Sequence, residues 1–513
     1  MRNPAVSTAV RVLSALLSVM MLAACSTGQR VDLGEGASGN LIAAIAGEPD
    51  QLDPHKTTAY FSFEVLENIY DTLVEPDENL EMQPALAQSW EVSPDQLTWT
   101  FRLRPGVTFH DGSPFTADDV VFSYRRIIDE ELSNVDKFSA VADVTAPDPM
   151  TVVIRLDRPT PNLLTNLGGF KGMAIVSRQN VESGQIASNP VGTGPFAFAG
   201  QKSGDSITLT ANNNYWAGPP KVPGVTFRFI SEPSTALSAL QAGEVDWTDS
   251  VPTQRVAQLE SDDSLHLAVT PSNDYWYLAL NEAKPPWNDV RVRQAIAYGI
   301  DRDAIVQATS YGTAALNQLA IPQGNPWFSP YDTYSYDLDK AKSLLEEAGA
   351  QPERLDMLVT SEYPETVTAA QIIADNLAPL GITVNIRTVD FATWLDEQNN
   401  GNFDMLMMGW LGNIDPDDFY YAQHHTEGTS NAQKFSDPEV DRLLDAGRVE
   451  TDRDARADDY ARAAGLIADK VSYIYLYNPS VIQAWNTALT GYDARRDGAI
   501  RFRTAELSED GGA

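Results

Sequence analysis

The chain has 513 residues and carries 71 acidic against 36 basic side chains, which gives a formal net charge of −35 at neutral pH. Proteins that bind nucleic acid need clustered Lys and Arg to neutralise phosphates, so this balance argues against a nucleic-acid partner. A single hydrophobic core stops growing at roughly 250–300 residues, so the length predicts more than one domain or lobe.

The N-terminus has the layout of a secretory signal peptide. Arg2 and Arg11 form a positively charged start, and residues 12–23 are almost entirely apolar. This run is too short for a stable membrane span. The only cysteine of the chain, Cys25, follows small residues as in a bacterial lipobox. We therefore expect residues 1–24 to be removed and Cys25 to be lipidated; the alternative is a buried cysteine in a short signal-anchor helix.

Residues 25–40 are rich in Gly, Ser and charged side chains, which is typical of a flexible tether. Short strands and helices follow. Strands are indicated by apolar runs or by alternation of apolar and polar residues, and helices by apolar residues at helical spacing. In chain order these elements are a strand over 41–46, a helix over 62–73, a strand over 99–104, a helix over 117–128 and a strand over 152–156.

The second half has the helix–strand rhythm of an α/β lobe. Asp301 is suited to cap a helix, and Gly349 and Gly381 are suited to end one. We expect helices over 290–300, 301–309, 339–348, 366–380 and 393–398, and strands over 382–386 and 403–410. The predicted fold class is therefore α/β.

Four segments are similar to the signature sequences of one protein family. The longest spans residues 87–123 and includes the stretches LTWTFRLRPGV and TADDVVFS. The other three are residues 190–196, 239–246 and 288–302. On these motifs the chain resembles the family-5 extracytoplasmic solute-binding lipoproteins of peptide-type (dipeptide and oligopeptide) ABC transporters. The similarity runs from about residue 41 to beyond residue 475.

The resemblance implies a large, two-lobed periplasmic-binding-protein type II fold of the peptide-binding subclass, with the ligand cleft between the lobes. Lobe one would comprise residues 41–271 and 480–513, with an extra subdomain, and lobe two residues 272–479. It also implies a receptor and not an enzyme, which captures peptides and delivers them to the permease and ATPase subunits of an ABC importer. We expect a monomer without a cofactor, held at the outer face of the cell membrane through the lipid on Cys25 and facing the periplasm if the host has an outer membrane.

A closed cleft that buries a free peptide needs partners for the amides, the α-ammonium and the α-carboxylate, because each unpaired group costs several kcal/mol. In the oligopeptide-binding relatives, the loop that corresponds to Thr58, Ala59 and Tyr60 lines the cleft. These three residues are therefore candidate ligand contacts. The alternative is an ordinary turn before a helix.

The aromatic run Tyr275, Trp276 and Tyr277 lies at the expected first crossover between the lobes. Its side chains are candidates to clamp a ligand; alternatively, they fill the two faces of a strand, because successive side chains of a strand point in opposite directions. A candidate partner for the carboxylate of the ligand is Arg387, which lies on the alternating strand that begins at residue 382. Its spacing does not distinguish it from an exposed arginine.

The remaining candidates are Trp410, Gly412, Asn413 and Asp415. In peptide-binding relatives a strand ends in tryptophan, and a nearby aspartate pairs with the α-ammonium of the ligand. Asn413 stands at that position here, and an amide cannot neutralise a buried ammonium, which puts dipeptide capture of the usual kind in question. Asp415 would substitute only if the loop shifts, and Asp415 followed by Pro416 equally suits the start of a helix.

Three rival functions remain. The first is a receptor for a metal chelate, with His424, His425, Asp417 and Asp418 as possible metal ligands. This function is disfavoured, since adjacent histidines on one element point apart and no third ligand has a suitable spacing. An oligosaccharide receptor of the same fold would stack sugars on aromatic residues, and the candidates are Trp276, Trp287, Trp327, Trp394 and Trp410. A secreted hydrolase is disfavoured because the sequence has no His-Glu-x-x-His, no Gly-x-Ser-x-Gly and no phosphate-binding glycine loop.

Overall fold

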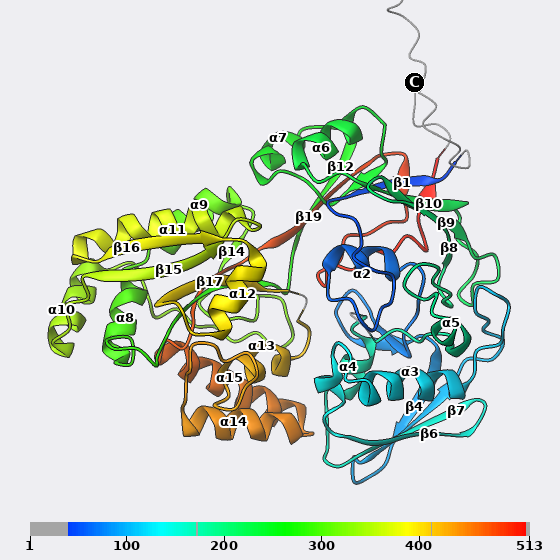
Figure 1. The fold of residues 1–513 in the computed structure, drawn as a ribbon, viewed down its shortest axis with the longest axis horizontal. Coiled ribbons are helices and arrows are strands. Elements are labelled where there is room, and N and C mark those ends of the chain that lie inside the picture. The colour runs from blue at the N-terminus through cyan, green and yellow to red at the C-terminus, as the bar shows by residue number, and fades with distance from the viewer. Residues whose placement is uncertain (1–38, 171–172, 412, 509–513) are drawn as a thin grey trace, which may run out of the picture. The chain divides into compact units, whose positions relative to one another are not determined.

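The computed structural model of the protein describes residues 39–170, 173–411 and 413–508. The expected signal peptide, Cys25 and nearly all of the expected tether lie outside the described residues. Within these ranges, no helix combines the length and the apolar composition that crossing a bilayer requires. Two large sheets and one smaller sheet organise the described part of the chain (Figure 1).

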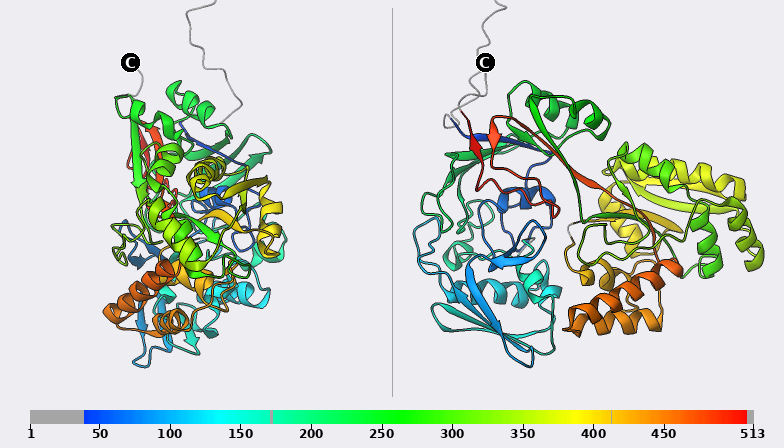
Figure 2. Two further views of the ribbon diagram at one scale, coloured as in Figure 1. Left: turned by 90° about the vertical axis from the view of Figure 1, so that its left-hand side faces the viewer. Right: turned by 180° about the vertical axis from the view of Figure 1, so that it is seen from behind.

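The first large sheet draws strands from both ends of the chain (Figures 1 and 2). Its central strand β1 (Leu41–Ile45) confirms the expected strand and runs parallel to both neighbours. Ala43 belongs to a core that includes residues of α2, while Ala44 belongs to a core on the other face with residues of α6 and α7. Across the sheet the strands are β12 (Leu265–Pro271), β19 (Ser480–Asn486), β11 (Trp247–Thr248), β1, β10 (Gly224–Phe229), β9 (Ser206–Ala211) and β8 (Phe196–Lys202).

A four-stranded antiparallel sheet forms a separate core with helix α3 (Ala117–Asp129), which lies along one face of the sheet (Figures 1 and 2). The helix agrees with the expected range. At its start, the carboxylate of Asp119 accepts hydrogen bonds from the backbone N–H and the hydroxyl of Thr116, at 2.9 and 3.0 Å. Across the sheet the strands are β4 (Ala87–Val92), β5 (Thr98–Leu103), β7 (Thr151–Leu156) and β6 (Val141–Asp148).

Helix α2 (Tyr60–Leu66) is shorter than the expected helix over 62–73. After Leu66, the carbonyl of Asn68 accepts a hydrogen bond from the N–H of Phe196 at 3.0 Å, and the carbonyl of Ile69 accepts one from Gly194 at 2.9 Å. These carbonyls are therefore bound to a distant segment and do not continue the helix. The second half of the prediction was wrong because tertiary hydrogen bonds replace helical ones.

The second large sheet draws all its strands from residues 275–478. Along its strand β13 the side chains alternate between two cores, with Leu278 and Leu280 on one face and Tyr277 and Ala279 on the other. Helices therefore cover both faces. Across the sheet the strands are β14 (Ala315–Leu316), β18 (Ile474–Asn478), β13 (Tyr275–Leu280), β17 (Met405–Trp410), β15 (Arg354–Thr360) and β16 (Thr383–Val389).

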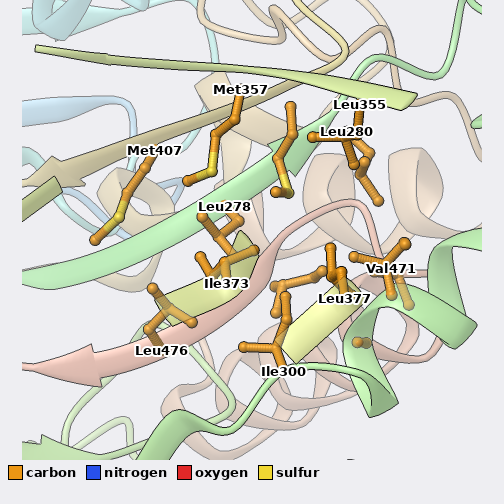
Figure 3. Close-up of a cluster of buried hydrophobic side chains, with 14 of the residues drawn as sticks. Leu278, Leu280, Ile300, Leu355, Met357, Ile373, Leu377, Met407, Val471 and Leu476 are labelled. Atoms are coloured by element: carbon orange, nitrogen blue, oxygen red, sulfur yellow. The ribbon is translucent and has the colours of Figure 1, made fainter. Parts of the chain in front are cut away.

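Figure 3 shows part of the core on one face, where Leu278 and Met407 of the sheet gather with Ile373 and Leu377 of α11. The helices in this part of the chain are α8 (Val290–Tyr298), α9 (Arg302–Ser310), α10 (Leu338–Ala348), α11 (Pro364–Leu377), α12 (Phe391–Asn399), α13 (Pro416–His424), α14 (Pro438–Val449) and α15 (Arg453–Asp469). The five expected helices correspond to α8–α12 to within a few residues; a helix at α13 was only an alternative interpretation, and α14 and α15 were not predicted.

The expected helix ends follow from side-chain and glycine chemistry. Asp301 caps α9 by accepting a hydrogen bond from the N–H of Ala304 at 3.0 Å. Gly349, with φ +63°, ends α10, and Gly381, with φ +81°, follows the 3₁₀ turn η3 (Ala378–Leu380) after α11. Both angles lie in the left-handed region, which favours glycine.

The chain passes between the two large sheets twice, from β12 to β13 and from β18 to β19. The two connections are hydrogen-bonded to each other: the N–H and hydroxyl of Ser272 donate to the carbonyl of Pro479 at 3.2 and 2.8 Å. The side chain of Asn478 also donates to the carbonyl of Asp274 at 2.7 Å. The two large sheets are thus joined by a pair of short segments that lie side by side.

The remaining elements are short. They are α4 (Leu163–Gly168), α5 (Arg178–Glu182), α6 (Pro233–Gln241), α7 (Val256–Leu259), η1 (Val135–Phe138), η2 (Thr253–Arg255), the strand pair β2 (Val74–Pro76) and β3 (Met82–Pro84), and the strand pair β20 (Leu489–Thr490) and β21 (Glu506–Leu507). The 3₁₀ turn η1 and helix α4 carry residues that line the cavity described below.

Candidate ligand-binding cleft

A cavity of about 600 Å³ opens between two groups of residues that are far apart in the sequence. The first wall comprises Glu67, Pro76, Asn134, Asp136, Lys137, Ser139, Ala140, Arg158, Thr160, Asn162, Thr165, Asn166, Gly169, Phe170, Met173, Asp497, Ala499 and Arg501. The second wall comprises Trp410, Leu411, Asn413, Ile414, Asp417, Asp418, Tyr421, Ala422, Gln423, Glu427, Gly428, Thr429, Ser430 and Arg448. The second wall is built from the end of β17, helix α13 with the loop that follows it, and the end of α14.

An ion pair connects the two walls. Lys137 on η1 binds the carboxylate of Asp418 in the first turn of α13. Burial lowers the pKa of Lys137, but the neighbouring Asp418 outweighs it and holds the pKa above its usual value. The backbone of Lys137 is fixed in turn, because its carbonyl accepts a hydrogen bond from the side chain of Asn166 at 3.2 Å.

Two further carboxylates lie at the start of α13, one on its N-cap residue Asp415 and one in its first turn on Asp417, and each has its own arginine. Asp415 accepts two hydrogen bonds from Arg456, at 2.6 and 2.8 Å, and both side chains are about 4% exposed. Asp417 lies 3.3 Å from Nε of Arg448 and accepts a hydrogen bond from the hydroxyl of Tyr460 at 2.9 Å. Burial raises the pKa of Asp417 to about 6, although Arg448 offsets part of the shift.

Asp415 also starts helix α13, as the sequence allowed. Its carboxylate accepts a hydrogen bond from the N–H of Asp417 at 3.0 Å, and Pro416 occupies the first helical position. The predicted helix start is therefore confirmed. Both carboxylate oxygens of Asp415 already bind Arg456, and a ligand contact by this residue stays a prediction.

Two of the sequence-predicted site residues line the cavity. Trp410 is the last residue of β17, where it pairs with Tyr275 of β13, and it is half-buried. Asn413 is also half-buried, and its side-chain nitrogen has no hydrogen-bond partner among the described residues. Gly412 lies outside the described residues.

The family model of bacterial extracellular solute-binding proteins, family 5 (middle), matches residues 81–431, which is more than half of the chain. The chain belongs to this family. A glutathione-binding protein of Pectobacterium atrosepticum is 28% identical over 504 residues, covering 95% of this chain and 98% of the relative. Heme-binding protein A of Haemophilus influenzae is 31% identical over 446 residues, covering 80% and 81%.

A solved structure supports the same assignment. An ABC transporter-associated periplasmic binding protein of Helicobacter pylori, in complex with the peptide STSA, has a TM-score of 0.81 at 28% identity and covers 92% of this chain and 98% of its own. The family and the two-lobed type II fold expected from the motifs are thus confirmed. The protein is an extracellular solute-binding protein, and the cavity is its candidate ligand site.

The loop before α2 does not reach the cavity of this solute-binding protein. Thr58 is exposed and Ala59 precedes the helix as its N-cap. Tyr60 is half-buried, and its hydroxyl donates a hydrogen bond to the carbonyl of Gly498 at 3.2 Å. Burial, with Glu64 and Asp249 nearby, raises the pKa of Tyr60 well above its usual value. The loop is therefore a turn before a helix, which is the alternative that the sequence left open. Its contact with a ligand stays a prediction.

The aromatic run on β13 lies in the core. Tyr275 and Tyr277 are each 1% exposed on one sheet face, and Trp276 is 7% exposed on the other. The ring of Tyr275 stacks on Phe419, with centroids 6.0 Å apart. None of the three lines the cavity, so they fill the two faces of a strand in this structure, and their contact with a ligand stays a prediction.

Arg387 and the paired histidines also have other partners. Arg387 forms an ion pair with Glu397 of α12 and does not line the cavity. His424 is fully buried and forms hydrogen bonds with the hydroxyls of Ser472 and Tyr475, at 2.8 and 2.9 Å. Within the ranges that the structure describes, no group of three His, Cys, Asp or Glu side chains is placed to hold a metal ion.

Sequence reasoning missed the basic side chains of the cavity, namely Lys137, Arg158, Arg448 and Arg501. None of them belongs to a sequence motif that points to the cleft. Only the tertiary fold brings these residues to one cavity.

Proposed function

We propose that this solute-binding protein is the receptor of an ABC importer for peptides, and that it binds them in the cavity between Trp410 and Arg158 without chemically altering them. The observation that carries the proposal is the lining of the cavity by two walls from distant parts of the chain. A volume of about 600 Å³ also falls in the range of small-molecule and short-peptide sites.

The proposed lobes follow the two large sheets. Lobe one comprises residues 41–271 and 480–513, and lobe two comprises residues 272–479. The hydrogen-bonded connections at Ser272 and Pro479 would act as the hinge. A ligand that contacts both walls binds only the closed form fully, so it shifts the population toward that form, which then docks on the permease.

Peptide chemistry fits the polar groups of the first wall. A peptide presents N–H and C=O groups that must be hydrogen-bonded when they are buried. Neutral side chains that can donate and accept cluster there, and they are Asn134, Ser139, Thr160, Asn162, Thr165 and Asn166. Trp410 and Asn413 would supply an apolar surface and an amide from the other wall.

The names of the relatives support peptides but include other solutes. Glutathione and STSA are both peptides, and heme is not. The oligosaccharide and metal-chelate alternatives are therefore retained as arms of the test.

The proposed setting is the outer face of the cell membrane. Lipidation of Cys25 would tether the receptor near its permease and raise its effective concentration there. We propose that it works as a monomer with the permease and ATPase subunits of the importer, and without nucleic acid. Mass spectrometry of the mature N-terminus from the native host tests the anchor, because an unmodified Cys25 or cleavage at another position contradicts it.

The binding test is a thermal-shift and calorimetric screen of the purified protein against peptides of two to five residues, oligosaccharides, metal chelates and heme. A ligand at one hundred times its Kd stabilises the folded state by about 2.7 kcal/mol, which a rise in Tm reports. We expect peptides to raise Tm and to be recovered intact. Stabilisation by sugars or chelates alone would reject peptide capture, and turnover of any peptide would reject the non-enzymatic role.

A further inference from the structure

Among the described residues, Arg158 is the cation of the cavity that has no carboxylate within 4 Å. The other three cations of the cavity are all paired: Lys137 with Asp418, Arg448 with Asp417, and Arg501 with Glu75 and Glu67, at 3.0 and 3.7 Å. The positive charge of Arg158 is thus left without a carboxylate partner in the cavity.

The guanidinium of Arg158 is held in place by neutral groups. One terminal nitrogen donates to the hydroxyl of Ser139 at 3.1 Å, and the other donates to the carbonyl of Ser139 at 3.4 Å. The backbone is also fixed, because the hydroxyl of Thr160 donates to the carbonyl of Arg158 at 3.2 Å. An arginine has five N–H donors, so three remain for a ligand.

The surroundings of Arg158 suit an uncharged or anionic group. Four uncharged residues, Thr160, Asn162, Thr165 and Asn166, line the same wall, and the acid of this wall nearest in sequence, Asp136, is exposed and forms no ion pair with Arg158. Asn166 is only 9% exposed, and its side-chain oxygen has no hydrogen-bond partner among the described residues. An N–H group of a ligand would satisfy this oxygen.

The opposite wall offers little to a cation. The three carboxylates at the start of α13 are already neutralised by Arg456, Arg448 and Lys137. Glu427, the remaining carboxylate on this wall, is exposed to solvent, and Asn413 carries no charge. An ammonium group that reaches the start of α13 would therefore have to compete with an ion pair that the protein already makes.

We propose that Arg158 binds a carboxylate of the peptide ligand, and that this protein recognises the anionic group of a peptide more strongly than its α-ammonium. The proposal rests on the proposed function of peptide capture. The carboxylate has two possible sources, the C-terminus of the peptide or an acidic side chain. A planar guanidinium donates two hydrogen bonds to a carboxylate in the same bidentate geometry, whichever of the two sources supplies it.

Calorimetric titration tests the proposal with the tetrapeptide Ser-Thr-Ser-Ala as the free peptide, as its C-terminal amide and as its N-acetylated form. We expect amidation to weaken binding to the wild-type protein by about tenfold or more, as the loss of a charge-assisted hydrogen bond does. We expect N-acetylation to change Kd by less than about threefold. Ser-Glu-Ser-Ala amide reports on the side-chain source, since recovery of affinity by its glutamate shows that a side-chain carboxylate suffices.

The matched variants are Arg158→Gln and Arg155→Gln. Arg155 lies three residues earlier on β7, is 64% exposed, neighbours Asp143 at 3.7 Å and does not line the cavity. In Arg158→Gln the tenfold effect of amidation should disappear, whereas Arg155→Gln should behave as the wild type. Arg158→Lys keeps the charge and should retain part of the effect, which separates charge recognition from a folding defect.

The outcomes distinguish this inference from the proposed function. If free peptide and amide bind equally tightly, or if Arg158→Gln keeps the tenfold effect, peptide capture stands and the role of Arg158 is wrong. If N-acetylation weakens binding more than amidation does, the preference for the anionic group is wrong. If no form of the peptide binds, the inference fails together with capture of this peptide.

Discussion

Lys137 and Asp418, which are 281 positions apart in the sequence, form an ion pair that joins the two walls of the cavity. Their side chains are 27% and 13% exposed, so the pair is largely shielded from water. Removing one partner leaves the other charge partly buried and unpaired. We expect Lys137→Gln to lower the free energy of unfolding by about 1–3 kcal/mol, measured by urea denaturation.

A double-mutant cycle separates the pair from other effects, because Asp418 also accepts a hydrogen bond from the N–H of Asp415 at 3.4 Å. The double variant Lys137→Gln with Asp418→Asn should be more stable than the sum of the single changes predicts, by at least about 0.5 kcal/mol. Strictly additive single effects would show that the pair does not couple the two walls.

The ion pair between Asp415 and Arg456 should stabilise the folded protein. Both side chains are about 4% exposed, and two hydrogen bonds join them. Asp415→Ala leaves a buried guanidinium without its partner, so we expect a loss of about 3–5 kcal/mol in the free energy of unfolding. Asn413→Ala, two residues earlier, should cost about 1 kcal/mol or less, because its side-chain nitrogen has no partner to lose among the described residues.

The comparison of the two variants is informative about function as well. If Asp415→Ala leaves the unfolding midpoint in urea unchanged but abolishes ligand binding, Asp415 belongs to the ligand site and its structural role is smaller than the buried ion pair implies.

The sequence predicts the local features of this fold well, because caps and periodic patterns act over a few residues. The start of α13 at Asp415 and Pro416 and the end of α10 at Gly349 are examples. The sequence did not predict the end of α2, since distant residues bind the carbonyls of Asn68 and Ile69.

The family motifs led to the fold, but not to the charges in the cavity. Whether Asp415 faces a ligand or Arg456 depends on a partner 41 positions away, and no spacing rule connects the two. The pairing of Lys137 with Asp418 is still more distant in sequence. Among the predicted ligand contacts that the structure describes, Trp410 at the end of β17 and Asn413 just after it also line the cavity.

His424 should make stability depend on pH. Burial lowers its pKa to about 3, against about 6.5 in an unfolded chain. Between these values the unfolded chain binds more protons, so the stabilisation is complete above pH 6.5 and is lost as the pH falls toward 3. The slope should reach about 1.4 kcal/mol per pH unit.

Urea denaturation at pH 7, 6 and 5 measures this slope in the wild type and in His424→Gln. The variant should lose less stability between pH 7 and 5 than the wild type does. His266→Gln, the same substitution at an exposed position of β12, is the control. Equal slopes in all three proteins would show that another group controls the acid sensitivity.

Trp410 should contribute to ligand binding through its apolar surface. It lines the cavity at the end of β17, so we expect Trp410→Ala to weaken peptide binding by about 1 kcal/mol or more. Trp410→Phe keeps an aromatic ring and should recover part of that loss. Calorimetry measures both, with Tm as the control for folding. Unchanged affinity in the alanine variant would remove Trp410 from the site.

A crystal structure of the protein grown with Ser-Thr-Ser-Ala tests the central claim, capture of a peptide between two walls, most directly. We predict peptide density in the cavity, in contact with Trp410 or Asn413 on one side and with Arg158 on the other. Peptide bound outside this cavity, or against one wall alone with the lobes apart, would contradict the account.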